Sequence, residues 1–352
     1  MPSHFTFYKK QDILSFTKIR RFETKLGERV RVIADSNDFE KSLQESNAKY
    51  VVFGVKENVG IRANGENSAD KNVWWPFLES FLNIQSNDFL DGEEIMVLGY
   101  FDFSDMENVI EANSQSFDEK TEAYRHAVTR VDTEVEQMVH LITQNKKLPI
   151  VISNGNNNAY PCIKGAAKGW YKSGEISFSQ VNAVNLDVLS GYGPIEGRHS
   201  GNSFRYAEED GYLEKYCMVG LNENQITQNV WMDIVNNPFL DCITYEDIFI
   251  HEKKNFIQAV GDACDFTDDT LCGIEINAGA ISPMACNDIN ASGIELRYAR
   301  QFVNYAALDL KPAYLHISNE VKEIFSSQYN IPAGKFVSYL VSDFVKAQQQ
   351  VR

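Results

Sequence analysis

The most constraining feature of this sequence is a repeated alternation between short apolar runs and longer stretches with helical periodicity. The apolar runs are nearly continuous, which is typical of parallel strands that are covered on both faces. We expect strands at RVRVIA near residue 31, YVVFGVK near 52, EIMVLGYF near 97, LPIVISN near 150, VNAVNLD near 184, KYCMVGL near 217, FLDCITY near 242, LCGIEIN near 274 and AYLHIS near 315.

Amphipathic helical patterns lie between these runs, and the clearest extends from Glu119 to Asn145. Its apolar stripe consists of Ala127, Val131, Val135, Met138 and Ile142. Further helices are expected at Asn222–Asn236, His251–Cys264, Ile294–Leu308 and Lys335–Gln349. Strand–helix–strand repetition of this kind predicts a doubly wound α/β fold, with helices on both faces of a mostly parallel sheet.

The chain of 352 residues, 43% of them hydrophobic, is long enough to bury a large core. No glycine- or proline-rich linker interrupts it, so we expect a single domain over residues 1–352. Residues 1–110 are a candidate N-terminal elaboration of the main sheet. The stretch GIRANGENSADKN, residues 60–72, is expected to be a long polar loop.

The net charge of −16 argues against nucleic acid or an anionic membrane surface as a partner, because no basic field attracts phosphates. The six cysteines form no C-x-x-C pair, which disfavours a zinc or redox motif. The N-terminus has no long apolar segment, and no stretch approaches the length of a membrane span. These features predict a reduced, cytoplasmic protein.

Three predicted strand ends bear on function: VISNGNNNAYP at 151–161, VNLDVLSGYGPIEGRHSGN at 184–202, and LCGIEINAGAISP at 271–283. In order and context, over roughly residues 90–345, they resemble the ureohydrolases arginase, agmatinase and formimidoylglutamase. GNNNAYP and EGRHSGN resemble the formimidoylglutamase-like branch most. The resemblance implies a three-layer α/β/α, arginase-like fold. It also implies a binuclear manganese site, with ligands from a Gly-Gly-x-His loop and from Asp-x-His-x-Asp and Asp-x-Asp strand ends.

Most of the metal ligands that this resemblance implies are replaced. Only one of the six positions, Asp187, keeps the residue of the family. The other five are Asn156, Leu189, Gly191, Asn277 and Gly279. Manganese favours carboxylate and imidazole donors, and without the metals there is no bound water of lowered pKa to act as nucleophile. We therefore expect no metal ligands and no manganese cofactor in this chain.

Other histidines offer only weak substitutes for the lost ligands. Asp187 and His199 could form a ligand pair, whereas His316 at a strand end is more simply a hydrogen-bonded histidine. A triad of Ser190, His199 and Asp187 is unconvincing because all three lie in one loop without a nucleophile elbow. By resemblance, Asn319 stands where the family has a glutamate.

Part of the substrate-binding loop is retained. By resemblance, Arg198, Ser200, Gly201 and Asn202 match the segment that holds the amino-acid end of the substrate. Arg198 could bind a carboxylate through two parallel hydrogen bonds, or could instead pair with an acid such as Glu196 or Asp187. Asparagines at and beside the ligand positions predict a neutral, hydrogen-bonding cavity. The predicted substrate-binding residues are Arg198, Ser200, Asn202, Asn156, Asn157 and Asp187.

The favoured interpretation is a metal-free pseudoenzyme with a ureohydrolase fold. It would bind a small amino-acid-like carboxylate, form homo-oligomers, or partner a catalytic relative. One alternative is an active hydrolase of C–N bonds in amino-acid derivatives, of the formimidoylglutamase or arginase type, with an altered or single-metal site. A second alternative is a purely structural subunit, since the family assembles into trimers and hexamers.

Overall fold

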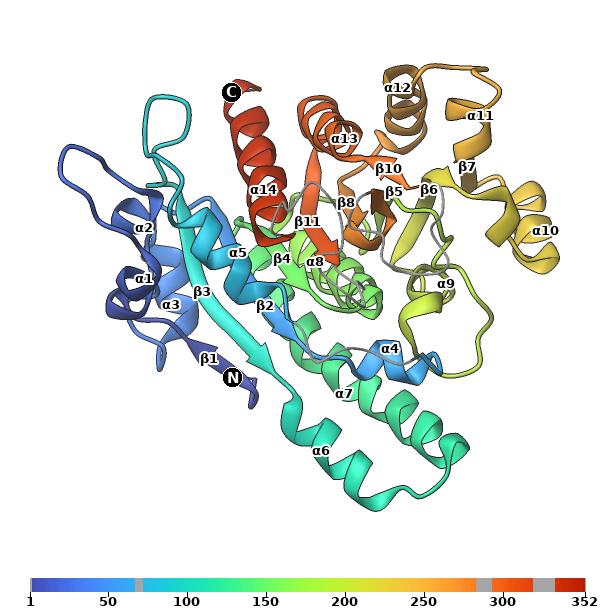
Figure 1. Cartoon of the computed structure of the whole chain (residues 1–352), viewed down its shortest axis with the longest axis horizontal. Helices are drawn as coiled ribbons and strands as arrows, with labels where there is room; N and C mark the ends of the chain where they lie inside the picture. The colour runs from blue at the N-terminus through green and yellow to red at the C-terminus, as the bar shows by residue number, and fades with distance from the viewer. Residues whose placement is uncertain (1, 67–71, 283–292, 319–332, 352) are drawn as a thin grey trace.

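The computed structural model describes residues 2–66, 72–282, 293–318 and 333–351, and its centre is a nine-stranded sheet (Figure 1). The strand order is β1-β3-β2-β4-β11-β8-β5-β6-β7. β1 is antiparallel to β3, and every other neighbouring pair in the sheet is parallel. The strands of this sheet are β1 (Phe5–Phe7), β2 (Tyr50–Lys56), β3 (Ile95–Asp102), β4 (Leu148–Ser153), β5 (Val181–Leu186), β6 (Leu213–Leu221), β7 (Leu240–Thr244), β8 (Cys272–Asn277) and β11 (Pro312–Ser318). The two-residue strands β9 (Ile281–Ser282) and β10 (Ile294–Glu295) form a separate parallel pair.

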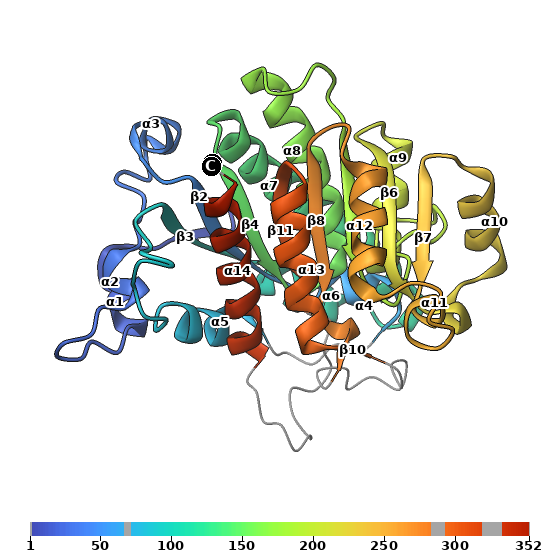
Figure 2. The same ribbon diagram turned by 90° about the horizontal axis from the view of Figure 1, so that it is seen from above.

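Helices cover both faces of the sheet, so the fold is a three-layer α/β/α arrangement (Figure 2). One face packs against α1 (Lys10–Phe16), α2 (Leu26–Arg29), α5 (Trp74–Phe81), α11 (Tyr245–Phe249), α12 (Phe256–Thr267), α13 (Leu296–Asp309) and α14 (Ala333–Gln350). The other face packs against α3 (Phe39–Glu45), α4 (Val59–Ala63), α6 (Ser104–Asn113), α7 (Phe117–Gln144), α8 (Ala159–Ser173), α9 (Ser203–Glu209) and α10 (Gln228–Asn236).

The order of the strands brings the loops that follow β4, β8 and β5 close together. After β4 the chain passes to β5, leaving room for two strands between them, and continues outward through β6 and β7. β8 and β11 later fill the gap between β4 and β5. Because parallel strands end at the same edge of the sheet, the loops after β4, β8 and β5 meet there, which is where open α/β sheets bind ligands.

Eight of the nine predicted strands are confirmed, and the prediction for RVRVIA is wrong. That stretch follows the short helix α2, and Arg31 makes only an isolated bridge to Met96. The physical reason is that Lys10 satisfies the local carbonyl groups. Its Nζ donates to the backbone oxygens of Gly27, Glu28 and Val30 at 3.1, 3.0 and 2.9 Å. Of these, Val30 belongs to the stretch, and its carbonyl is satisfied without a neighbouring strand.

The predicted helices exist, but three begin later than expected. α13 begins two residues late, at Leu296, and polar caps fix the first turns of the other two. α10 begins after Thr227, whose hydroxyl accepts from the N–H of Val230, and α12 begins after Asn255, which caps Gln258. The stretch 60–72 is not a loop throughout, because α4 extends over its first residues, up to Ala63. Residues 67–71 of this stretch lie outside the described part.

The first 110 residues are built into the main sheet, to which they supply β1, β2 and β3. Trp74 and Phe77 of α5 share one core with Phe336 and Leu340 of α14, so the N-terminal third of the chain packs against the C-terminal helix. Within the described part, no helix is both long and apolar enough to span a bilayer.

Close approach of α7 and α8 depends on glycine, which gives a first prediction. A Cβ added at Gly165 would lie 2.6 Å from the backbone oxygen of Glu136 and 2.8 Å from Cβ of Val139. We expect Gly165→Ala to lower the free energy of unfolding by about 1–3 kcal/mol, because overpacking forces the helices apart.

Gly261→Ala in α12 is the matched control, because the nearest atoms to its added Cβ belong to the half-buried side chain of Tyr305, with the hydroxyl at 3.2 Å, and none is backbone. That change should be neutral or stabilising by up to about 1 kcal/mol through helix propensity. Urea unfolding of both variants checks this, and equal effects would contradict the role of Gly165.

Candidate functional site

The loops that follow β4, β5 and β8 enclose a cavity of about 190 Å³ at the carboxyl edge of the sheet. Residues from the segments 154–158, 187–202 and 277–282 therefore meet at this edge, while Pro283 lies outside the described residues. The described lining comprises Asn64, Glu66, Asn156, Asp187, Leu189, Ser190, Gly191, Gly193, Pro194, Ser200, Gly201, Gln225, Thr227, Val230 and Asn277. Asn319, which also lies outside the described residues, is not placed.

Asp187 is a buried carboxyl at the end of β5, and Asn277 at the end of β8 is its principal partner. Asn277 Nδ2 donates to Asp187 Oδ2 at 3.1 Å, and the N–H of Leu189 donates to Oδ1 at 3.2 Å. Burial raises the pKa of Asp187 to about 7. The hydrogen bonds from Asn277, Leu189 and Val188 oppose the rise, and the charge of Glu275 adds to it. This carboxyl therefore titrates near neutral pH.

Gly191 and Phe204 show how the loop after β5 is closed without a side chain at position 191. Gly191 has a φ of +58°, and a Cβ there would lie 2.7 Å from the Phe204 ring. Phe204 stacks on Tyr216 with 4.1 Å between ring centroids, so it has little freedom to move aside. A side chain at position 191 would meet both backbone strain and this aromatic pair.

The residues at the six resemblance-derived positions do not suit a pair of manganese ions. Asp187 is the one carboxylate among them. Asn156 and Asn277 offer neutral amide oxygens, and Asn277 Oδ1 already accepts from the N–H of Gly279 at 2.9 Å. Leu189 and the two glycines offer no side-chain donor. Within the described ranges, no cluster of three or more His, Cys, Asp or Glu side chains could hold a metal ion.

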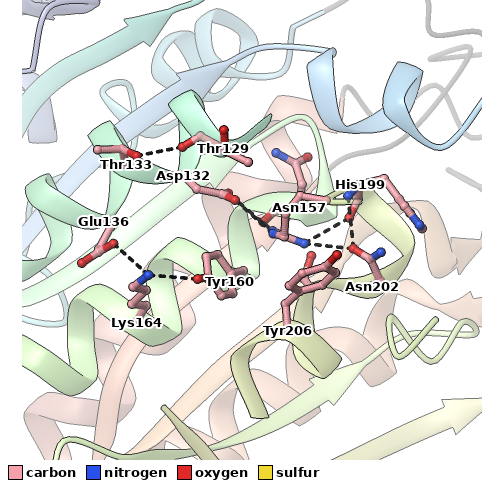
Figure 3. A network of polar contacts seen from close by, with 12 residues as sticks. Thr129, Asp132, Thr133, Glu136, Asn157, Tyr160, Lys164, His199, Asn202 and Tyr206 are labelled. Atoms are coloured by element: carbon pink, nitrogen blue, oxygen red, sulfur yellow. Dashed lines mark hydrogen bonds and ion pairs between the residues drawn. The ribbon is translucent and has the colours of Figure 1, made fainter. Parts of the chain in front are cut away.

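Arg198 lies in a buried network beside the cavity and is not one of its described lining residues. Figure 3 shows Asp132, Asn157 and Asn202, which belong to this network. Its Nε and Nη2 donate to the carboxylate of Asp132 on α7 at 3.0 and 3.4 Å. The remaining N–H groups donate to Asn202 Oδ1 and to the backbone oxygens of Asn157 and His199 at 3.0, 3.0 and 3.5 Å. A ligand carboxylate could reach Arg198 only by displacing one of these five bonds.

Aromatic rings and burial complete the surroundings of this ion pair. The guanidinium carbon of Arg198 lies 4.4 Å from the ring centroid of Tyr160 and 5.1 Å from that of Tyr206. Both rings thus present their faces to the cation. Burial raises the pKa of Asp132, and the adjacent Arg198 opposes that rise. The partner of Arg198 is therefore Asp132, and neither Glu196 nor Asp187 takes this role.

The other predicted substrate-binding residues divide between the cavity and this network. Asn156, Asp187 and Ser200 line the cavity. Asn202 is absent from the described lining, because its Oδ1 binds Arg198 and its Nδ2 donates to the backbone oxygens of Pro194 and Gly197 at 3.0 and 2.8 Å. Asn157 is fully buried and contacts Arg198 through its backbone oxygen.

The two histidines near the strand ends are internal to the protein. Burial lowers the pKa of His199 to about 4, helped by the positive charges of Arg125 and Arg198, so its ring is neutral at pH 7. Its Nδ1 accepts from the N–H of Gly201 at 3.1 Å. His199 is absent from the described cavity lining. The structure therefore does not bring it beside Asp187 as a second metal ligand.

His316 joins Ser153 and Glu275 in the order of a catalytic triad. Its Nε2 lies 2.8 Å from Ser153 Oγ, and its Nδ1 lies 2.5 Å from Glu275 Oε2. All three side chains are at most 1% exposed, and none of them lines a described cavity. A nucleophile must reach a substrate, so we interpret this chain as structural support for β4, β11 and β8.

Asp132 is the residue of this region that the sequence reasoning missed, although a signal for it exists. It lies four residues after Val128 on the buried stripe of α7. An acid at an apolar stripe position requires a buried partner. Asn64, Glu66, Gln225 and Thr227 were also missed as lining residues, and no motif marks them.

Comparisons with solved structures identify the same fold. Formimidoylglutamase from Bacillus subtilis subsp. subtilis str. 168 aligns with a TM-score of 0.69 at 14% identity, covering 95% of this chain and 94% of that one. Trypanosoma cruzi formiminoglutamase with Mn²⁺ aligns with a TM-score of 0.64 at 16% identity, covering 92% and 98%. Proclavaminate amidino hydrolase from Streptomyces clavuligerus gives 0.64 at 10%, covering 95% and 99%.

At sequence identities of 10–16%, these comparisons establish similarity of the fold alone. No family model matches the sequence, and a comparison with curated proteins gives no match.

The buried ion pair gives a second prediction. Asp132→Ala should lower the free energy of unfolding by about 3–5 kcal/mol, because it leaves the Arg198 cation buried without a counter-ion. The control is Glu122→Ala on the same helix, which removes an exposed partner of Arg125 at 3.3 Å and should cost less than about 1 kcal/mol. Denaturant unfolding measures both, and a small loss for Asp132→Ala would refute the importance of the pair.

The pKa of Asp187 gives a third prediction. The folded value of about 7 exceeds the ordinary 3.8, so the folded state binds this proton more tightly than the unfolded state. The resulting stabilisation is complete below about pH 4 and is lost as the pH rises to about 7, at up to about 1.4 kcal/mol for each pH unit.

Asp187→Asn removes this titration, and any pH-independent cost of the change leaves the slope unaffected. The free energy of unfolding of the wild type should therefore fall relative to that of Asp187→Asn between pH 4 and 7. Parallel pH profiles for the two proteins would show that Asp187 does not titrate in this range.

Proposed function

We propose that this arginase-like chain is a metal-independent binding protein that holds a small polar ligand at Asp187. The observation that supports this most directly is the pairing of the Asp187 carboxyl with the Asn277 amide at the edge of the sheet. An isolated carboxyl with amide and backbone donors can bind a hydrogen-bonding group. It cannot balance the charge of two dications.

The lining of the cavity defines the chemistry of the ligand. Its described charged residues are the acids Asp187 and Glu66, and its other polar side chains are amides and hydroxyls. No lysine, arginine or histidine occurs among the described lining residues. The group that enters should therefore donate hydrogen bonds, as an ammonium, amidine or amide does, while a carboxylate would be repelled.

The size of the cavity supports a ligand smaller than a drug. About 190 Å³ is below the range of roughly 300–1,000 Å³ that is usual for drug-sized molecules. An amino-acid-like ligand that enters with its nitrogen end fits both the volume and the acidic lining. In this proposal its carboxylate, if present, stays outside the cavity, because Arg198 is already fully bonded.

Hydrolysis of a C–N bond is not part of this proposal. A metal-bound water of lowered pKa would supply the nucleophile, and the described donors do not suit a manganese pair. The rival is a hydrolase with a single metal ion, for which Asp187 would be a ligand. The two proposals differ in metal content and in turnover.

The test is calorimetry of the purified protein with agmatine, arginine and glutamate, together with elemental analysis after incubation with manganese. We expect agmatine to bind more tightly than glutamate. Asp187→Asn should weaken agmatine binding by roughly 10–100-fold, as expected for loss of a charge-assisted hydrogen bond. Asp118→Asn, an exposed aspartate at the start of α7, is the control and should leave binding unchanged.

Two results would overturn the proposal. About two equivalents of manganese per chain, with hydrolysis of any of these compounds that chelation abolishes, would establish the hydrolase. Absence of binding for all three compounds would leave a structural role for the fold.

A further inference from the structure

The loop between α1 and α2 exposes large apolar side chains among basic ones. Phe22 is 92% exposed and Ile19 is 61% exposed, and Lys18, Arg20 and Arg21 beside them are also exposed. Among the described residues these three cations form no ion pair, although Arg21 lies 4.7 Å above the Phe22 ring. We call residues 18–22 the basic loop.

The backbone of the basic loop is strained at its most exposed residue. Phe22 has a φ of +65°, in the left-handed region that bulky side chains rarely adopt. Such strain persists only where the surrounding structure imposes it, and it often coincides with recognition sites. A phenylalanine held outward in this way contributes nothing to the core of its own chain.

The charge around the basic loop is opposite to that of the whole protein. Residues 18–31 contain six basic and two acidic residues, a net charge of +4, while the chain as a whole has −16. Lys25 pairs with Glu23, and Arg29 pairs with Glu93 at 2.8 Å, so the outward field comes mainly from the basic loop itself. The adjoining turn at 86–93 supplies acids of its own, including Asp88 and Asp91.

A second exposed apolar surface lies on α10 and the turn into β7. Trp231 and Val235, one helical turn apart, are 40% and 59% exposed, and Met232 and Phe239 are exposed beside them. Val230 and Ile234 of the same helix are buried in the core, so the exposed side chains lie on the outward side of α10. We call Trp231, Met232, Val235, Phe239 and Asp241 the acidic face.

The charge of this segment is the reverse of that of the basic loop. Residues 222–252 contain six acidic residues and no lysine or arginine. Asp233 is paired with Arg205 at 2.7 Å, but Asp241 is exposed and forms no ion pair among the described residues. Lys253 and Lys254, which follow, are paired with Asp247 and Asp262.

The basic loop and the acidic face lie at opposite ends of the molecule. The strand order places β1 and β3 at one edge of the sheet and β7 at the other. Figures 1 and 2 show α1 and α2 at one end and α10 and α11 at the far end in both views. The two surfaces of one chain therefore cannot meet each other.

We propose that the basic loop of one copy of this chain docks on the acidic face of the next copy. Phe22 and Ile19 would pack against Trp231 and Val235, while Arg20 and Arg21 would face Asp241 and its acidic surroundings. Charge complementarity argues for a second copy, because the net charge of −16 repels nucleic acid and anionic lipid but suits a cationic loop. This inference does not depend on the proposed ligand.

Docking of two different surfaces is heterologous, which determines how the copies associate. Repetition of the same contact gives a ring if the rotation closes and an open filament if it does not. Every copy inside such an assembly uses both surfaces, while a copy with one surface destroyed can still form one contact. This property separates the proposal from a symmetric dimer.

The experiment is sedimentation equilibrium with two double variants, Arg20→Glu/Phe22→Ser and Trp231→Ser/Val235→Ser. Wild type should associate, more weakly in 1 M salt, because salt screens the charged contacts. Each double variant alone should associate at least roughly tenfold more weakly, since exposed aromatic and arginine anchors dominate interface energies. An equimolar mixture of the two should form a one-to-one dimer, because each supplies the surface that the other lacks.

Phe178→Ser is the matched control, since Phe178 is a 75% exposed phenylalanine outside both surfaces and its loss should leave association unchanged. Circular dichroism and thermal melting establish that each variant is folded. A monomeric wild type, an assembly that both double variants preserve, or a mixture that stays monomeric would each overturn the proposal. Binding of the monomer to vesicles of anionic lipid through Phe22 would do so as well.

Discussion

The cavity depends on the buried ion pair between Arg198 and Asp132. Removing both ions from water is expensive, and the cost is offset only because the guanidinium has all five of its hydrogen bonds and two aromatic faces beside it. One side chain thus holds together helix α7, the turn after β4 and the loop after β5. Since Ser200 and Gly201 lie two and three residues after Arg198 and line the cavity, the shape of the cavity is tied to this pair.

A row of hydrogen-bonded, buried polar side chains lies within the strands that end at the same edge of the sheet. Glu275 is the centre of the row, because it accepts from Tyr314 at 2.7 Å and contacts His316, which in turn reaches Ser153. Asn185, the neighbour of Glu275 in β5, donates to Tyr216 at 3.0 Å. Neutral amides beside one carboxyl can satisfy one another without an ion, whereas several carboxylates at this edge would repel. This row of hydrogen bonds and strand pairings links β4, β11, β8 and β5 at the edge that carries the cavity.

Much of the fold could be predicted because it rests on local patterns. Continuous apolar runs such as VNAVNLD and LCGIEIN are strands, and the apolar stripe around Val131 and Val135 is a helix. RVRVIA could not be assigned correctly, because the ammonium group of Lys10, some twenty residues away, binds the carbonyl of Val30 that a strand would have paired. The convergence of Asn156, Asp187 and Asn277 followed from their positions at the ends of parallel strands. The burial of Arg198 against Asp132 did not follow from the sequence, since 66 residues separate the two side chains.

The sequence by itself determined the layered α/β architecture and the residue types at the edge of the sheet. Hydrophobic periodicity acts over a few residues, and parallel strands must end at one edge. Only the tertiary structure decided which polar groups face the cavity and which face each other. Arg198 and Ser200 are two residues apart, yet Ser200 lines the cavity and Arg198 points to α7. The physical reason is that a buried charge must find its counter-ion, and packing of distant helices decides where that counter-ion lies.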